Sequence, residues 1–477
     1  MTKQLEEIFY PRSIAVVGAS DDPKKMSYLT VAGFIDMGFK GEIYPINRND
    51  TRSIEGKRPF KNVGEIPGPV DLAVISVPPP LVPSIIKDCT EKQVKGIINF
   101  SAPADELTPE EEEAIGYAVS RGTRIVGPNS MGLYCPHSGL ALFPGMSKEK
   151  GEVSFISHSG AMGWTFATFA AGRMIACNKV VTVGNEWDLS WLDFLEHLGA
   201  DPKTEIIGGY LEGLKDGRRF LEIAREISSK KPVIVIKGGS SQVGRDAVVS
   251  HTGSIAGEKE MWKSVLDQAG VIRVGGLDEL MDHVIAFRLL KDRPMGNRIG
   301  IVSGTAGPTV IAADLCEELD LEIPELPAST KDRIREFLPV YGSSDRNPVD
   351  VSIAGASDMR LYLQAIMALD DCEEIDVIYF IQSGEWQGNE LAAYLIDGTS
   401  GKLKKPLVVS LIGPPEKYSQ AVLDLLEANI PAFFTIEGPL KALRSLNRWA
   451  GKVKRGRERD CRSLGRGDSS EWEDKLS

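Results

Sequence analysis

Short runs rich in valine and isoleucine alternate with longer amphipathic patterns through most of this chain. Parallel sheets produce this alternation, because a helix returns the chain to the same sheet edge after each buried strand. We therefore predict an α/β fold built on doubly wound parallel sheets. The predicted strands cover residues 13–17, 42–46, 71–77, 96–100, 124–127, 152–157, 179–183, 205–211, 232–238, 298–303, 376–383 and 406–412.

The length of the chain sets the expected number of domains. A chain of 477 residues is too long for a single core, and a typical domain size suggests roughly three domains. We predict three Rossmann- or flavodoxin-like parallel-sheet domains over residues 1–130, 145–292 and 297–450, with a polar Pro/Gly stretch before the third. Residues 451–477 are rich in glycine, serine and charge, and we predict that they form a disordered tail.

Charge and cysteine content narrow the class of partner. A net charge of -12 repels phosphate backbones, so we expect neither a nucleic-acid nor an anionic-membrane partner. The six cysteines lie far apart, with no CxxC pair and no metal-ligand spacing, which is typical of reduced thiols and predicts no metal site. The N-terminus lacks the pattern of a signal peptide, and no apolar run approaches the roughly 18 residues of a membrane span. We expect a cytoplasmic protein.

The segment GASDDPKKM, residues 18–26, follows the first predicted strand and leads into a helix. Such a turn presents backbone N–H groups and a helix N-terminus, which together bind phosphate. The GxGxxG fingerprint is missing, and the second strand ends in Asn47 and Arg48 rather than in an acidic residue that would hold a nicotinamide ribose. This basic end suits a phosphorylated ribose, as in NADP or coenzyme A, and a turn without a ligand is the alternative. The candidate binding residues are Gly18, Ala19, Ser20, Lys24, Lys25, Asn47 and Arg48.

A second turn of this kind, SHSGAMG at residues 157–163, follows the strand predicted over 152–157. Ser157, Ser159 and Gly160 lie where free amides and hydroxyls converge at the positive end of a helix dipole, and His158 belongs to the same turn. Serine and glycine also cap helices routinely, so a purely structural turn is the alternative.

Two further residues carry possible chemistry. Glu212 closes a predicted strand at its carboxyl end, where open α/β sheets place their active sites. A carboxylate there can fix one tautomer of an imidazole and leave the other ring nitrogen free to attack, although a solvated surface glutamate is the alternative. His251 has serine, threonine and glycine neighbours that cannot pack it into a core. We therefore predict that His251 lies on a mobile loop before a helix that starts near Ile255.

The chain resembles the alpha subunit of the NDP-forming acyl-CoA synthetases, the ADP-forming acetyl-CoA synthetase group related to succinyl-CoA synthetase. The resemblance extends from about residue 8 to residue 450. A single phosphate turn would be weak evidence, but an ordered set of motifs is specific. The set is SIAVVGAS, GFKGEIYPIN, DLAVISVP, GPNSMG, SHSGAMG, VGNEWD, YLEGLKDGRRFLEIAR, KKPVIVIKGG, SHTGSIAG and NPVDV.

The resemblance implies a CoA-binding domain followed by two succinyl-CoA-ligase-like domains. It implies that His251 accepts a phosphoryl group from an acyl phosphate and that Glu212 orients the phosphorylated ring. It also implies an ATP-grasp beta subunit that binds ADP or ATP with Mg, and because no further domain follows Gly451 we expect the two-chain form, an α2β2 complex. By resemblance, phosphate and acyl phosphate bind at Ser157, His158, Ser159, Gly160 and Asn129, and CoA binds at Gly18, Ala19, Ser20, Lys24, Lys25, Asn47, Arg48, Val77 and Pro78.

Some positions depart from the family pattern. Members usually have glutamine or arginine at His158 and a small residue at Trp187, and Trp187 is a candidate for reshaping the acyl pocket. The segments 99–105 and 303–309 also differ. A non-catalytic CoA sensor or scaffold of the same fold is the competing hypothesis, but a sensor needs neither His251 nor Glu212. An NADP-dependent oxidoreductase is less consistent with a turn that lacks the dinucleotide fingerprint.

Overall fold

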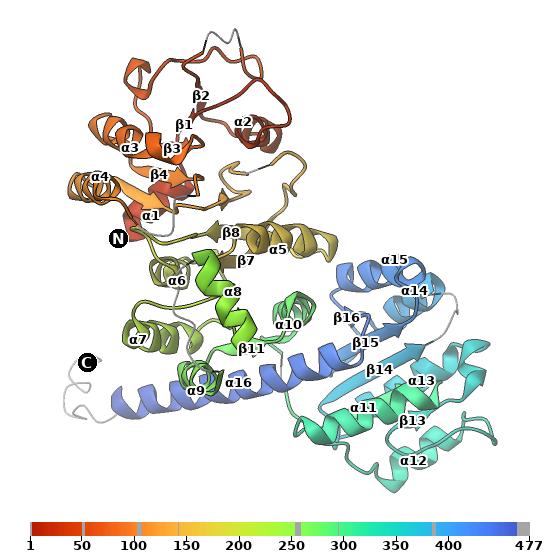
Figure 1. The fold of residues 1–477 in the computed structure, drawn as a ribbon. Coiled ribbons are helices and arrows are strands. Elements are labelled where there is room, and N and C mark those ends of the chain that lie inside the picture. The colour runs from red at the N-terminus through yellow and green to blue at the C-terminus, as the bar shows by residue number, and fades with distance from the viewer. Residues whose placement is uncertain are drawn as a thin grey trace, which may run out of the picture. The chain divides into compact units, whose positions relative to one another are not determined.

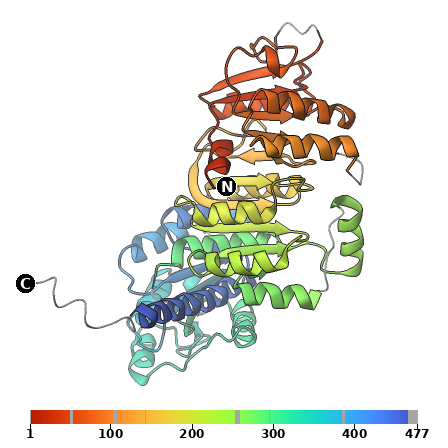
Figure 2. The same cartoon turned by 90° about the vertical axis from the view of Figure 1, so that its left-hand side faces the viewer.

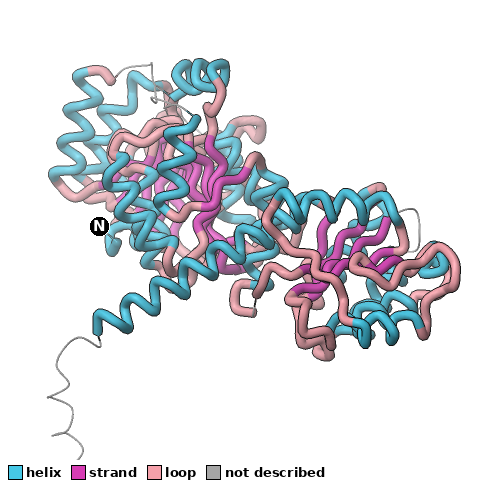
Figure 3. Tube along the Cα trace, turned by 90° about the horizontal axis from the view of Figure 1, so that it is seen from below, coloured by secondary structure: helices cyan, strands magenta, loops and turns pink. Residues whose placement is uncertain are grey.

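The structure is a computed structural model that describes residues 2–49, 53–102, 107–141, 143–252, 259–293, 295–383 and 388–464. The chain forms two compact units, Met1–Leu280 and Met281–Ser477. In each unit the strands form an inner layer and helices cover its faces (Figure 3). The prediction of a parallel-sheet α/β fold is confirmed.

The first sheet has the strand order β2-β1-β3-β4-β5, and all of its strands are parallel. Its central strands are buried along their whole length, which explains why they consist of Val, Ile and Ala with almost no polar residue. Figure 1 shows these strands beside α3 and α4. The elements are α1 (Thr2–Phe9), β1 (Ser13–Val17), α2 (Met26–Met37), β2 (Glu42–Ile46), η1 (Val63–Glu65), β3 (Leu72–Ile75), η2 (Pro79–Leu81), α3 (Val82–Glu91), β4 (Gly96–Asn99), α4 (Pro109–Ser120) and β5 (Arg124–Val126).

The second sheet belongs to the same unit and has the order β11-β10-β9-β7-β8-β6. All neighbours in it are parallel except β6, which runs antiparallel to β8 at one edge. The elements are β6 (Gly132–Tyr134), β7 (Lys150–Ser157), α5 (Gly160–Gly172), β8 (Cys177–Thr182), α6 (Trp191–Ala200), β9 (Ile206–Leu211), α7 (Gly217–Ser228), β10 (Val233–Lys237), α8 (Gln242–Thr252), α9 (Lys259–Ala269), β11 (Ile272–Val274) and α10 (Leu277–Leu290).

The second unit contains a parallel sheet with the order β13-β12-β14-β15-β16. Apart from the added β6, all three sheets therefore share one order, in which the first strand lies between the second and the third. The elements are β12 (Ile299–Ser303), α11 (Ala306–Glu318), α12 (Ala328–Arg335), β13 (Val349–Asp350), η3 (Ile353–Ala356), α13 (Arg360–Asp370), β14 (Val377–Ser383), α14 (Gly388–Thr399), β15 (Leu407–Ile412), α15 (Pro415–Glu427), β16 (Ala432–Phe433) and α16 (Glu437–Leu464).

The prediction of a disordered tail from residue 451 is wrong for residues 451–464, because α16 continues to Leu464. Leu443, Leu446 and Trp449 are buried at helical spacing and anchor the first half of this helix. Half of residues 451–464 are Lys, Arg or Glu, which have high helix propensity and favour continuation of the helix. The rest of the predicted tail, residues 465–477, lies outside the described residues.

One hydrophobic cluster joins the first and second sheets. It includes Val16 from β1, Ile98 from β4 and Ile156 from β7, together with Phe9 from α1. Beside it lies a buried charge, because the ammonium of Lys179, which is 0% exposed, contacts the carboxylates of Asp201 at 2.7 Å and Glu6 at 3.3 Å. The N-terminal helix is thus fixed to the second sheet by both apolar packing and an ion pair.

His197 packs against Phe9 of this cluster and makes the stability of the fold depend on pH. The imidazole is 2% exposed and stacks on Phe9 with a centroid distance of 5.5 Å. Burial, with a further contribution from the positive charge of Lys179, lowers the pKa of His197 to about 4. An unfolded chain binds this proton near pH 6.5. Folding therefore becomes less favourable as the pH falls from about 6.5 towards 4, and above that range the group has no effect.

We expect His197→Phe to flatten this pH dependence, because phenylalanine keeps the stacked ring and cannot bind a proton. Urea unfolding followed by tryptophan fluorescence would measure the free energy of unfolding of both proteins from pH 7 to pH 4. The wild type should lose up to about 3 kcal/mol more than the variant over this range. Equal losses would show that His197 is not the titrating group.

Candidate functional site

A cavity of about 540 Å³ opens where β1, β2 and β3 end. Two consecutive amides of the first turn, from Gly18 and Ala19, donate to the carbonyl of Ile46 at 3.0 Å each and so tie the turn to β2. Gly18 has a φ of +87°, and a Cβ at this position would lie 2.2 Å from the carbonyl oxygen of Ser76. Only glycine allows the turn to lie this close to the exit of β3.

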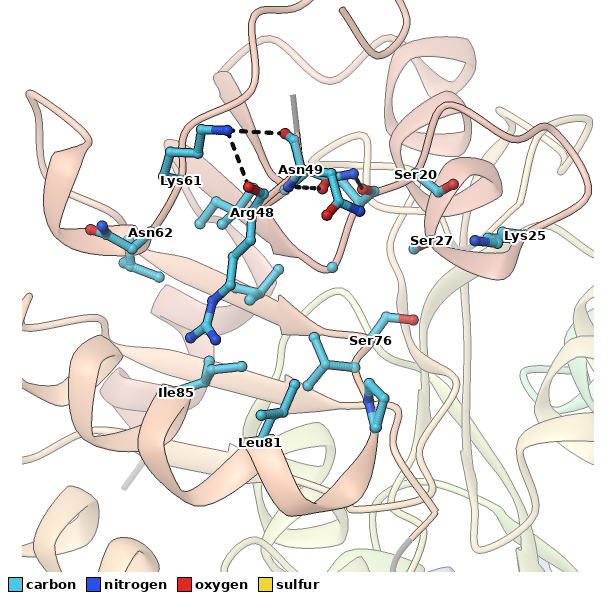
Figure 4. A pocket seen from close by; sticks show the side chains of 18 of the residues that line it. Ser20, Lys25, Ser27, Arg48, Asn49, Lys61, Asn62, Ser76, Leu81 and Ile85 are labelled. Atoms are coloured by element: carbon cyan, nitrogen blue, oxygen red, sulfur yellow. Dashed lines mark hydrogen bonds between the residues drawn. The ribbon is translucent and has the colours of Figure 1, made fainter. Parts of the chain in front are cut away.

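The structure brings most of the predicted CoA residues together around this cavity (Figure 4). Lys24 does not line it. The side-chain NH₂ group of Asn47 donates to the carbonyl of Ala19 at 2.8 Å, so this side chain supports the turn. Arg48 extends towards Leu81 and Ile85, which form an apolar part of the wall (Figure 4). The predicted residues that line the cavity are Gly18, Ala19, Ser20, Lys25, Asn47, Arg48, Val77 and Pro78.

Sequence reasoning missed Lys61 and Asn62, which line the same cavity. Lys61 donates to the carbonyls of Arg48 at 3.1 Å and Asn49 at 3.2 Å, as Figure 4 shows. Phe60 pairs with Ile46 at the end of β2, and this bridge brings the loop to the cavity. A loop with no periodic pattern gives no signal of such pairing. The cavity combines cationic side chains with an apolar wall, which suits a nucleotide that carries phosphates.

A second cavity, of about 530 Å³, lies in the same unit at the carboxyl ends of β7, β9 and β10. Ser159 caps α5, with its hydroxyl accepting from the amide of Met162 at 3.3 Å. Ser157 does not line the cavity, because it is 0% exposed and its hydroxyl donates to the carbonyl of Ser159 at 2.6 Å. The lining residues are Phe100, Asn129, Ser130, Met131, His158, Ser159, Gly160, Ala161, Tyr210, Glu212, Gly239, Gly244, Ala247 and Val248. The structure thus gathers Asn129, His158, Ser159, Gly160 and Glu212 around one cavity.

Glu212 is 6% exposed and lies among groups that respond to its charge. Burial and, secondarily, the charge and hydrogen bond of Glu212 raise the pKa of Tyr210 to about 12. Burial lowers the pKa of Lys237 to about 8, although the negative charge of Glu212 opposes this. The Lys237 ammonium donates to the carbonyl of Glu212 at 2.8 Å and lies 4.7 Å from the centroid of the Trp262 ring. The floor of the cavity therefore consists of polar groups that interact with one another through charge and hydrogen bonds.

The prediction that His251 lies in a loop is wrong for its backbone, because α8 runs from Gln242 to Thr252. The hydroxyl of Ser241 accepts from the amide of Gly244 at 3.0 Å and starts the helix. Gly244, Ala247 and Val248 of α8 line the second cavity, and Figure 2 shows this helix in green beside the strands of the second sheet. His251 lies one helical turn after Ala247, while its side chain and residues 253–258 lie outside the described part of the chain.

Trp187 does not line the second cavity. Its ring packs against the core of the first sheet, and its amide donates to the carbonyl of Gly127 at 3.0 Å. Of the other departures, residues 103–105 lie outside the described residues, Phe100 lines the second cavity, and α11 begins within the segment 303–309.

None of the helices in the described residues has the length and apolar character needed to cross a membrane. In the same part of the chain, no cluster of three or more His, Cys, Asp or Glu side chains is arranged to hold a metal ion.

Comparison with known proteins identifies the class. Residues 12–136 match a CoA binding domain, residues 150–287 a succinyl-CoA ligase like flavodoxin domain, and residues 299–456 a ligase-CoA domain. These three matches, together with the two cavities, define a CoA ligase of the succinyl-CoA ligase type. The chain belongs to the family of the ADP-forming acetate–CoA ligases, within which it aligns with the alpha subunit, as its motifs predicted.

Three relatives illustrate the match. The acetate–CoA ligase (ADP-forming) I subunit alpha of Pyrococcus furiosus is 37% identical over 94% of this chain and 98% of the relative. The 4-hydroxybutyrate–CoA ligase (ADP-forming) of Nitrosopumilus maritimus is 32% identical over 94% of this chain, which spans 64% of that longer protein. A structure of the Ca. Korarchaeum cryptofilum dinucleotide forming acetyl-coenzyme A synthetase 1, in complex with phosphate and ADP, is 31% identical, with a TM-score of 0.84 over 96% of this chain and 99% of that one.

The close approach of Gly18 to β3 allows a matched test of the first cavity. We expect Gly18→Ala to weaken CoA binding at least about tenfold, or about 1.4 kcal/mol, because the new methyl group must push the turn away from Ser76. Gly56→Ala is the control, since Gly56 also has a positive φ, +74°, but a Cβ there meets no atom within 4 Å. Calorimetric titration with CoA would measure both. Equal CoA affinities of the two variants would show that the first turn does not take part in CoA binding.

Proposed function

We propose that this chain is the alpha subunit of an ADP-forming acyl-CoA synthetase that interconverts acyl-CoA, ADP and phosphate with free acid, CoA and ATP. The single observation that carries the proposal is the second cavity, where a phosphate-type turn, Glu212 and the helix that bears His251 meet. The CoA cavity lies in the same compact unit. We further propose domain limits at residues 1–130, 145–292 and 297–450.

In the first step, an oxygen of inorganic phosphate attacks the carbonyl carbon of the acyl thioester. The C–S bond breaks, CoA leaves as the thiolate, which takes up a proton, and acyl phosphate remains. Amides at the start of α5, from Ser159 and Gly160, are placed to hold the phosphate oxygens, and Asn129 borders the same space. One preorganised donor of this type is worth about 3 kcal/mol of transition-state stabilisation.

In the second step, a ring nitrogen of His251 attacks the phosphorus of the acyl phosphate. The bond between phosphorus and the acyl oxygen breaks, and the carboxylate of the product acid leaves. Glu212 accepts a hydrogen bond from the other ring nitrogen, which fixes the tautomer and stabilises the positive charge on the phosphorylated ring. The helix that bears His251, α8, borders the cavity in which the acyl phosphate would lie.

In the third step, a terminal phosphate oxygen of ADP attacks the phosphorus of the phosphohistidine. The P–N bond breaks, the ring of His251 leaves, and ATP forms. We propose that a beta subunit of ATP-grasp type binds the nucleotide together with Mg and that the assembly is α2β2. The naming of the Pyrococcus furiosus relatives as alpha subunits supports a separate partner, whereas other relatives are longer single chains. The buried, unpaired cysteines among the described residues fit a reducing compartment, and we place the complex in the cytoplasm.

Phosphoryl labelling tests this proposal. The chain is mixed with its partner and with Mg-ATP labelled on the gamma phosphate, and the protein is assayed for label that is acid-labile and stable to base. We expect label on the wild type, none on His251→Ala, and less on Glu212→Gln, because the ring loses its charged partner. His137→Ala is the control, since His137 lines neither cavity.

Three outcomes would contradict all or part of the mechanism. Equal labelling of the wild type and His251→Ala would exclude the phosphohistidine. CoA binding without any label or turnover would favour the competing function, a CoA-binding scaffold. Unchanged labelling of Glu212→Gln would remove that residue from the mechanism.

A further inference from the structure

His158 connects the carboxyl ends of two neighbouring strands, β7 and β9, at the second cavity. It follows β7 directly, and its backbone amide donates to the carbonyl of Tyr210 at 3.2 Å. Its side chain reaches the residue just after β9, where Nδ1 accepts a hydrogen bond from the amide of Glu212 at 3.4 Å. The imidazole therefore continues the pairing of β7 and β9 after the backbone ladder has ended.

The other ring nitrogen is fixed by a buried carboxylate. Nε2 of His158 lies 3.3 Å from Oε1 of Glu186, and both side chains are less than 10% exposed. Because Nδ1 accepts, the proton of the neutral ring is assigned to Nε2, from which it points at Glu186. Glu186 is itself held, since the same oxygen accepts from the amide of Trp191 at 2.5 Å and its carbonyl accepts from Lys215 at 2.6 Å.

The peptide groups around Glu212 are consequently clamped at both sides. His158 holds the amide, and the ammonium of Lys237 holds the carbonyl at 2.8 Å. Glu212 lines the cavity. Because the clamp fixes the backbone from which its side chain extends, the position of its carboxylate depends on this clamp. An active-site carboxylate that is out of place by a fraction of an ångström costs rate, because a hydrogen bond weakens steeply with geometry.

We propose that His158, braced by Glu186, is a positioning residue that fixes Glu212 for phosphoryl transfer to and from His251. The inference rests on the proposed function and deepens it. The clamp requires the neutral ring, because a protonated imidazole carries N–H on both nitrogens and cannot accept from Glu212.

The charged groups around the ring come from several elements. Glu186 faces it from the segment between β8 and α6, and Glu212 follows β9. Lys215, from the segment after β9, donates to the carbonyl of Glu186, and Lys237 of β10 donates to the carbonyl of Glu212. Arg245 of α8 lies near Lys237, whose pKa its positive charge helps to lower. Neither α5 nor residues 127–132 contain a charged side chain.

Glutamine provides the decisive substitution. In His158→Gln the side-chain oxygen can accept from Glu212 and the side-chain NH₂ can donate to Glu186, so both hydrogen bonds persist without a group that binds a proton. His158→Ala removes both hydrogen bonds. The matched control is His137→Gln, the same change at a histidine that lines neither cavity.

The variants are compared as complexes with the partner subunit, by kcat and by KM for CoA near neutral pH. We expect His158→Ala to lower kcat about tenfold or more, as loss of an orienting hydrogen bond typically does, and to leave KM for CoA nearly unchanged because CoA has its own cavity. His158→Gln should keep nearly full kcat, because both hydrogen bonds persist. His137→Gln should match the wild type throughout.

Amide hydrogen exchange of residue 212 provides a readout independent of turnover. Exchange should be faster in His158→Ala and unchanged in His158→Gln. Equal losses of kcat in the two variants, wild-type kcat in His158→Ala, or unchanged exchange in His158→Ala would overturn the positioning role. Failure of the proposed function looks different, because the wild-type complex itself would then show neither turnover nor phosphohistidine.

Discussion

The shared strand order is the constraint on which both cavities depend. In each sheet the chain places its second strand on one side of the first and its third strand on the other, so the loops that leave the first and third strands diverge. Such switch points are where open α/β sheets bind ligands. The first cavity lies between the exits of β1 and β3, and the second lies between those of β7 and β9. The cluster that packs the first two sheets together keeps the two openings at a fixed separation.

In the proposed mechanism both cavities take anionic ligands, although the chain carries a net charge of -12. The first uses cationic side chains, among them Lys25, Arg48 and Lys61. The described residues that line the second include no lysine or arginine, and Lys237 below it donates to carbonyl groups. The proposed mechanism therefore assigns stabilisation of the phosphate there to amide dipoles at the start of α5. Such groups would stabilise a transferring phosphoryl group without forming a strong ion pair that opposes its departure.

The sequence predicted the long strands, because burial on both faces gives them continuous apolar runs. It also predicted the two strand–turn–helix segments and the place of Glu212 at the end of a strand, because these depend on local sequence. The short edge strands β6, β11, β13 and β16 have only two or three residues each, too few to show periodicity. Lys61 reaches the first cavity through a bridge between Phe60 and Ile46, which no local pattern encodes. Small residues concealed the helix that bears His251, whose start depends on the cap formed by Ser241. The buried side chain of His158 acquires its role only from the neighbouring strand.

The weak anchoring of α8 has an energetic consequence. Of residues 242–248, only Val248 is buried, and Val243 is 79% exposed. One buried valine contributes about 1.5 to 3 kcal/mol, and a helix of this length has almost no stability of its own in water. A free energy of about 1.5 to 3 kcal/mol corresponds to between about one molecule in ten and about one in a hundred and sixty with residues 242–248 detached at any moment. In the proposed mechanism, stronger packing of these residues would improve the stability of the fold and hold the phosphoryl group on the subunit that received it.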